Sequence, residues 1–88
     1  MSDQISAILT ERAKTHGDYS DHARITQKLK TIFRSEVPYG KLDYCQHEAI
    51  DMILHKIGRI AAGNPNFQDH WDDIAGYAKL VSDRCAKA

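Results

Sequence analysis

One stretch, residues 47–60, constrains the fold of this 88-residue chain more than any other. Its aliphatic side chains recur at intervals of three and four residues, at Ile50, Ile53, Leu54, Ile57 and Ile60. This spacing gives an α-helix one apolar side, which is stable in water only when another element covers it. The sequence therefore predicts a long amphipathic helix around which the remaining chain must pack.

The same helix carries an unusual polar side. Rotation by the helical step places Glu48, Asp51, His55 and Arg59 together, away from the apolar side. Two carboxylates one turn apart can hold a cation, and the guanidinium further along can hold an anion. A solvated helix face accounts for the same charges, so the pattern alone leaves both interpretations open.

Three further helices are predicted from apolar periodicity and capping residues. The four helices are expected to begin at Ser2 or Asp3, at Asp18 or Ser20, at Asp43 and at Asn66. They are expected to end at His16-Gly17, at Val37–Gly40, at Gly63 and near the C-terminus. No segment alternates as a strand would. We therefore expect an all-α, up-down four-helix bundle over residues 1–88, a single helical domain with the last two helices antiparallel.

The side chains expected to face the interior follow the same periodicity. The first helix should bury Ile5, Ile8, Leu9 and Ala13, the second Ile25, Leu29, Ile32 and Phe33, and the last Trp71, Ile74, Ala75, Ala78, Val81 and Cys85. Four short helices leave apolar area uncovered, so a homo-oligomer is expected, with part of the first or second helix at its interface.

Charge and cysteine content exclude several functions. Twelve basic and twelve acidic residues balance, so neither a nucleic-acid polymer nor a membrane is an expected partner. No apolar run is long enough to span a bilayer, and Asp3, Gln4 and Glu11 interrupt the N-terminal apolar residues, unlike a secretory signal. Cys45 and Cys85 lack metal-ligand spacing and are expected to be reduced, semi-buried thiols of a cytoplasmic protein.

A second acidic pair lies on the last predicted helix. Asp69 and Asp73, four residues apart, project to one side, whereas Asp72 points elsewhere. Favourable interaction with the helix dipole explains Asp69 and Asp72 without any ligand. If the last two helices are antiparallel, however, this pair can face Glu48 and Asp51. Four carboxylates that close repel one another unless a divalent cation neutralises them.

Two further groups of residues permit both a functional and a structural interpretation. Lys56 and Arg59 are either ordinary surface cations or phosphate ligands beside the acidic pairs. The loop His16-Gly17-Asp18-Tyr19 is either a helix-capping turn or a lip that contacts a base or ribose.

Three blocks carry a resemblance that covers nearly the whole chain. They are Arg12-Ala13-Lys14-x-His16-Gly17-Asp18-Tyr19, His47-Glu48-Ala49-x-Asp51-x-x-x-x-Lys56-Ile57-x-Arg59-Ile60 and Asp69-x-Trp71-x-Asp73-Ile74-Ala75-Gly76-Tyr77-Ala78. They resemble a family of small phage and prophage proteins, mostly of unassigned function. That family is similar in turn to the all-α nucleoside triphosphate pyrophosphatases of the MazG-like and dimeric dUTPase superfamily, which bind magnesium through two acidic pairs on separate helices.

The resemblance implies specific roles. Glu48 and Asp51 match the first acidic pair, Asp73 matches the final aspartate, and Asp69 stands near the acid that precedes it. The chain departs from the pattern where Asp51 replaces a glutamate and where His70 lies three residues before Asp73. The resemblance thus implies a metal set of Glu48, Asp51, Asp69 and Asp73. If the protein is such an enzyme, we expect a catalytic set of Glu48, Lys56 and Arg59 and a substrate-binding set of His16, Asp18, Tyr19, His55 and Tyr77.

Two functions follow from these roles. The first is hydrolysis of (deoxy)nucleoside triphosphates to a monophosphate and pyrophosphate with Mg²⁺ or Mn²⁺, with Glu48 as the general base and a homodimer or homotetramer as the active form. The second is a non-catalytic phage accessory protein that binds a nucleotide or a host protein.

Overall fold

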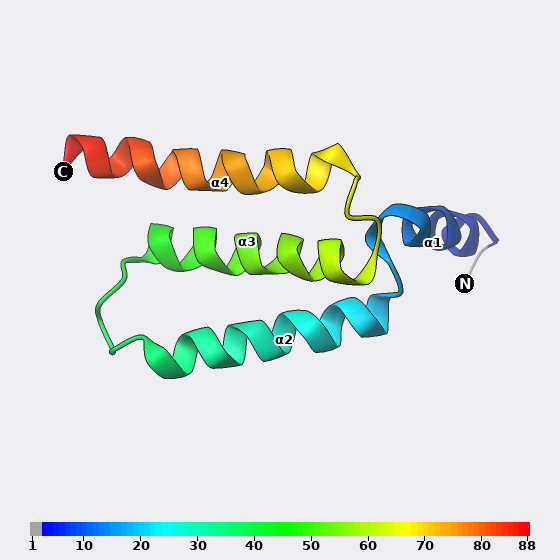
Figure 1. Ribbon diagram of the computed structural model, residues 1–88, viewed down its shortest axis with the longest axis horizontal. Helices are drawn as coiled ribbons and strands as arrows, with labels where there is room; N and C mark the ends of the chain where they lie inside the picture. Colours follow the sequence, from blue (N-terminus) through cyan, green and yellow to red (C-terminus); the bar gives the residue numbers. More distant parts are fainter. Residues whose placement is uncertain (1–2) are drawn as a thin grey trace.

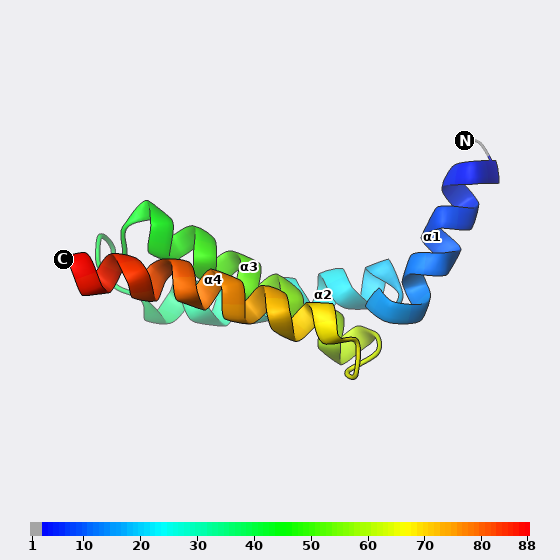
Figure 2. The same cartoon turned by 90° about the horizontal axis from the view of Figure 1, so that it is seen from above.

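The computed structural model describes residues 3–88 and contains four helices: α1 (Asp3–His16), α2 (Tyr19–Glu36), α3 (Tyr44–Ala62) and α4 (Gln68–Lys87). Helices α2, α3 and α4 run antiparallel in one layer with α3 in the middle, and α1 projects from one end of it (Figure 1, Figure 2). The predicted all-α fold without strands is confirmed for the described residues. The arrangement differs from four helices around one core, because α4 packs along α3, does not pack against α2, and meets α1 only at the C-terminal end of α1.

The predicted caps of the two middle helices are confirmed. The carboxylate of Asp18 accepts a hydrogen bond from the backbone N–H of Asp21, at 3.2 Å. Asp43 accepts one from the backbone N–H of Gln46 at 2.8 Å, and the Gln46 side chain accepts one from the Asp43 N–H at 3.0 Å. This reciprocal capping box satisfies two backbone donors at the start of α3.

The predicted start of the last helix is wrong. Phe67, not Asn66, is the N-terminal cap residue of α4, and no side chain caps that end. Asn66 instead donates its backbone N–H to the side-chain oxygen of Asn64, at 2.9 Å. The asparagines therefore stabilise the turn between α3 and α4, and the helix begins just after it.

The predicted interior is also partly wrong, because few apolar side chains are buried. Ala49 is the one buried hydrophobic residue described, Ile32 is 64 % exposed and Trp71 is 52 % exposed. The other residues predicted as interior but found exposed are Ile5, Ile8, Leu9, Ala13, Ala75, Ala78 and Cys85. Both cysteines are free and exposed rather than semi-buried. The reason is geometric: a single layer covers each helix only where it meets its neighbour, and α1 projects beyond the layer.

The overall dimensions reflect this open arrangement. The accessible surface is 6535 Å², whereas a compact protein of this mass exposes roughly 5,200 Å². The radius of gyration is 15.2 Å, against about 12 Å for a compact domain of this length. None of the helices within residues 3–88 has the length and apolar character needed to cross a membrane.

Two glycines join α1 to the layer. Gly17 has a φ of +79°, and a β-carbon there would overlap the backbone of Ala62. A β-carbon on Gly63 would overlap the backbone of Thr15, whose carbonyl oxygen accepts a hydrogen bond from the Asn64 N–H at 2.9 Å. Both positions need glycine because two backbones pass in direct contact.

Three alanine substitutions test this junction. Gly40 shares the φ of +79° but has open space where a β-carbon would lie. Gly40→Ala should therefore cost only the left-handed backbone energy, on the order of 1–2 kcal/mol, and Gly17→Ala should cost more. Gly76→Ala, in open space within α4, should stabilise by about 0.5–1 kcal/mol. Chemical denaturation measures all three, and equal losses at Gly17 and Gly40 would contradict the close contact.

Candidate functional site

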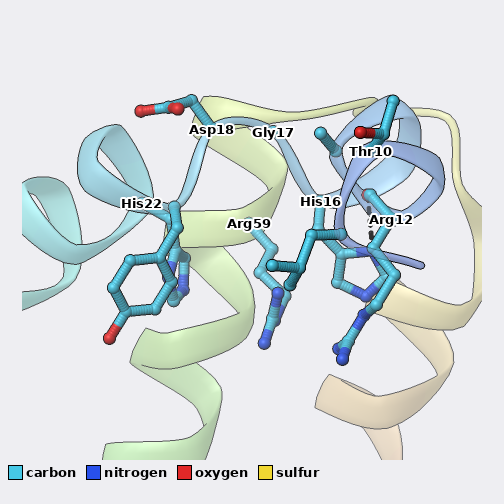
Figure 3. A pocket seen from close by; sticks show the side chains of 10 residues that line it. Thr10, Arg12, His16, Gly17, Asp18, His22 and Arg59 are labelled. Carbon is cyan, nitrogen blue, oxygen red and sulfur yellow. Dashed lines mark hydrogen bonds between the residues drawn. The ribbon is translucent and has the colours of Figure 1, made fainter. Parts of the chain in front are cut away.

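A pocket of about 530 Å³ lies where α1 joins the layer, and we call it the arginine pocket (Figure 3). It is formed by the C-terminal half of α1, the turn into α2, the start of α2 and one residue of α3. Its lining residues are Leu9, Thr10, Arg12, Ala13, His16, Gly17, Asp18, Tyr19, His22 and Arg59.

Two guanidinium groups give the pocket its positive charge. The side chains of Arg12 and Arg59 come from α1 and α3 and extend in the same direction beside His16 (Figure 3). Arg59 is half-buried, and its Nε is buried without a hydrogen-bond partner. Burial first, and then the charge of Arg12, lower the pKa of Arg59. Neither arginine forms a salt bridge with any carboxylate of residues 3–88.

One wall of the pocket is held by a pair of histidines. His16 donates from Nδ1 to the carbonyl oxygen of Arg12 at 3.2 Å, and its ring meets that of His70 edge-on with centroids 4.9 Å apart. His70, only 1 % exposed, donates from Nε2 to the carbonyl oxygen of Thr15 at 2.9 Å. Helix α4 thereby fixes the end of α1. Burial lowers the pKa of His16, and the charge of Arg59 lowers it further.

A second pair of histidines lies between α2 and α3. Buried His22 donates from Nε2 to the carbonyl oxygen of His55 at 3.0 Å, and the two rings meet edge-on with centroids 4.5 Å apart. Thr26 packs against Gly58, where a β-carbon would overlap the threonine hydroxyl, so glycine lets α2 and α3 approach closely. Burial, followed by the charge of Arg59, lowers the pKa of His55 to about 4.

The carboxylates predicted to bind a metal lie elsewhere and do not converge. Asp51 forms an ion pair with Arg34 of α2 at 3.4 Å, whereas Asp73 of α4 forms one with Lys56 at 2.8 Å. The first pair joins α2 to α3 and the second joins α3 to α4, and α3 lies between those two helices (Figure 1). Lys56 also keeps the pKa of Asp73 low, through a hydrogen bond and its charge.

The other two members of the predicted metal set add no ligand. Glu48 lines a separate groove with Tyr77 between α3 and α4, and Asp69 is exposed. Residues 3–88 contain no group of three or more His, Cys, Asp or Glu side chains placed to hold a metal ion. In the single chain Asp51 of α3 pairs with α2 and Asp73 of α4 pairs with Lys56, so the convergence of the four carboxylates is not seen among the described residues and stays a prediction.

The predicted substrate-binding and catalytic residues are only partly brought together. His16, Asp18, Tyr19 and Arg59 share the arginine pocket, and the ring of His55 contacts His22 behind it. Lys56, Glu48 and Tyr77 lie outside it. The carboxylate of Asp18 accepts hydrogen bonds from the Ser20 hydroxyl and the Asp21 backbone N–H, and these bonds lower the pKa of Asp18. Asp18 therefore acts as a helix cap, as the structural interpretation of this loop predicted.

Sequence reasoning missed the roles of Arg12 and His22 in this pocket. Arg12 stands four residues before His16, so helical spacing places both on one face of α1 and a search for such pairs would have found it. His22 carried no comparable signal, since its place depends on the close approach of α2 to α3.

The fold and pocket define a small all-helical protein with a cationic pocket at the junction of its first three helices. The family model described as "Domain of unknown function (DUF6378)" matches residues 1–85, and the chain belongs to that family. No curated protein and no solved structure matches the chain.

The lowered histidine pKa values predict an acid-sensitive fold. Below about pH 6.5, the ordinary histidine pKa, the unfolded chain takes up protons that folded His16, His22 and His55 resist. Their contribution to stability is thus complete above that pH and is lost as the pH falls towards 4. The melting temperature should fall over this range, and less steeply in His55→Gln. His47→Gln, at an exposed position of α3, is the matched control. A melting temperature independent of pH would contradict the prediction.

Proposed function

We propose that this protein binds the phosphate groups of a nucleotide in the arginine pocket. The observation that carries the proposal is Arg59, a half-buried guanidinium with no carboxylate partner among the described residues and with Arg12 beside it. A desolvated positive charge beside a like charge is unfavourable until an anion neutralises both. Guanidinium groups match phosphate oxygens through paired N–H donors, so a phosphate is the anion that this arrangement suits best.

The rest of the pocket suits the organic part of such a ligand. A volume of about 530 Å³ falls within the usual range for small-molecule sites, about 300–1,000 Å³. Leu9 and Ala13 supply apolar surface, and the ring of Tyr19 is exposed at the rim, where a base can stack on it. The resemblance to the all-α nucleoside triphosphate pyrophosphatases supports a (deoxy)nucleotide as the ligand.

Binding without hydrolysis is the role that the geometry favours. Mg²⁺ requires oxygen ligands gathered around one point, whereas Asp51 of α3 is paired with Arg34 of α2 and Asp73 of α4 is paired with Lys56 of α3. The carboxylates of the single chain therefore do not fit the metal, and no hydrolytic step is assigned to them. The accessory role predicted for a phage protein agrees with this arrangement, while pyrophosphohydrolysis with Mg²⁺ or Mn²⁺ is the alternative that a pyrophosphate-release assay tests.

Nucleotide titration of arginine variants tests the binding site. A charge-assisted hydrogen bond contributes roughly 1.5–3 kcal/mol, so Arg59→Gln and Arg12→Gln should each weaken binding of deoxynucleoside triphosphates about tenfold or more. Arg24→Gln removes an exposed arginine outside the pocket and should leave the affinity unchanged. Isothermal calorimetry with nucleotides, pyrophosphate and phosphate measures the effect. Wild-type affinity in Arg59→Gln, or no binding of any of these anions, would refute the proposal.

Pyrophosphate release separates binding from hydrolysis. In the presence of Mg²⁺ or Mn²⁺ we expect canonical and modified deoxynucleoside triphosphates to remain intact, because the described carboxylates form no metal set. Release that disappears in both Asp51→Asn and Asp73→Asn would show that these carboxylates act together, and a catalytic role would then replace the binding role.

A further inference from the structure

A second concave surface lies at the other end of the layer, and we call it the apolar groove. Residues of α2, α3, α4 and the loop between α2 and α3 line it, and its volume is about 520 Å³. It is lined by Phe33, Leu42, Gln46, Ala49, Ile50, Ile53, Ala78, Val81, Ser82 and Cys85. None of these side chains carries a formal charge, and α1 contributes none of them.

The apolar groove exists because the layer lacks a further helix over it. Helix α4 packs along α3 and touches α1 only through His70, and α1 projects from the opposite end (Figure 2). The accessible surface of 6535 Å² exceeds that of a compact protein of this mass by roughly 1,300 Å². A stable interface of standard size buries about 800 Å² on each partner. The excess of the whole chain, to which the projecting α1 also contributes, is larger than this area.

We infer that a second copy of this chain covers the apolar groove. In the pairing we propose, the two grooves face each other across a twofold axis, and α4 of each copy lies in the groove of its partner. In a twofold dimer the same surface of both copies is in contact, so charged groups near the axis would face groups of the same sign. The lining of the apolar groove contains no carboxylate, ammonium or guanidinium group. The chain as a whole is also neutral, so no net repulsion opposes association.

The side chains of α4 suit this pairing. Ala78, Ser82 and Cys85 are small and exposed and recur at helical spacing along the wall of the apolar groove. Small side chains let two helices approach closely, and Val81 among them adds apolar area. A charged peptide from another protein would find no complementary group in this lining. The arginine pocket is lined by α1 and the residues that follow it, and α1 lies at the opposite end of the layer from the apolar groove (Figure 1), so the proposed pairing leaves the pocket open.

Sedimentation of charge variants tests the inference. At micromolar concentration the protein should sediment as a dimer, at twice the chain mass of 10.0 kDa. Ala78→Glu places a carboxylate in the apolar groove and should give a monomer. Leu80→Glu, two residues along α4 and 64 % exposed outside this groove, should remain a dimer. Circular dichroism checks that both variants keep their helices, which is expected because both positions are exposed.

Thiol alkylation provides a second measurement on the unmodified chain. Cys85 lines the apolar groove and Cys45 does not, although both are exposed in the single chain. Alkylation of Cys85 should therefore slow as the protein concentration rises, while the rate at Cys45 stays constant. A monomer at all concentrations, a dimer that survives Ala78→Glu, a dimer lost in Leu80→Glu, or a concentration-independent rate at Cys85 would each overturn the inference.

Discussion

The arrangement of this molecule depends on one contact between two backbones, at residues 15–17 and 62–64. Gly17 and Gly63 allow the turn after α1 to lie directly on the turn after α3, and the hydrogen bond from Asn64 to Thr15 closes the contact. Helix α1 has no buried side chain of its own to hold it in place. The position of Arg12 relative to Arg59 therefore depends on this glycine contact, together with the hydrogen bond from His70 to Thr15.

The helices and most of their ends could be predicted from the sequence, because those features are local. Asp18 and Asp43 act on backbone groups three residues away, and periodicity alone identifies the apolar side of α3. Periodicity does not reveal whether a neighbour covers that side. Ile32 and Trp71 follow the helical pattern and still face solvent, because the layer has no partner for them.

The candidate site was predictable only where helical spacing or chain proximity determines it. His16 and Tyr19 share one turn of chain, and Arg59 joins them because α3 ends beside that turn. Asp51 and Asp73 do not form one site in the single chain, because each forms its own ion pair, with Arg34 and Lys56 respectively. The spacing of residues along two helices does not show which basic side chain pairs with each carboxylate, since that depends on how each helix is rotated about its own axis in the layer.

Helix α1 is attached to the rest of the molecule at one end only. It contacts the layer near its C-terminal end, while its other end projects away (Figure 2). With a rise of 1.5 Å per residue the helix is about 20 Å long, so a tilt of about 10° at Gly17 displaces the far end by roughly 4 Å. A change of tilt at Gly17 would therefore move the N-terminal end of α1 further than it moves Arg12, which lies near the C-terminal end of the helix.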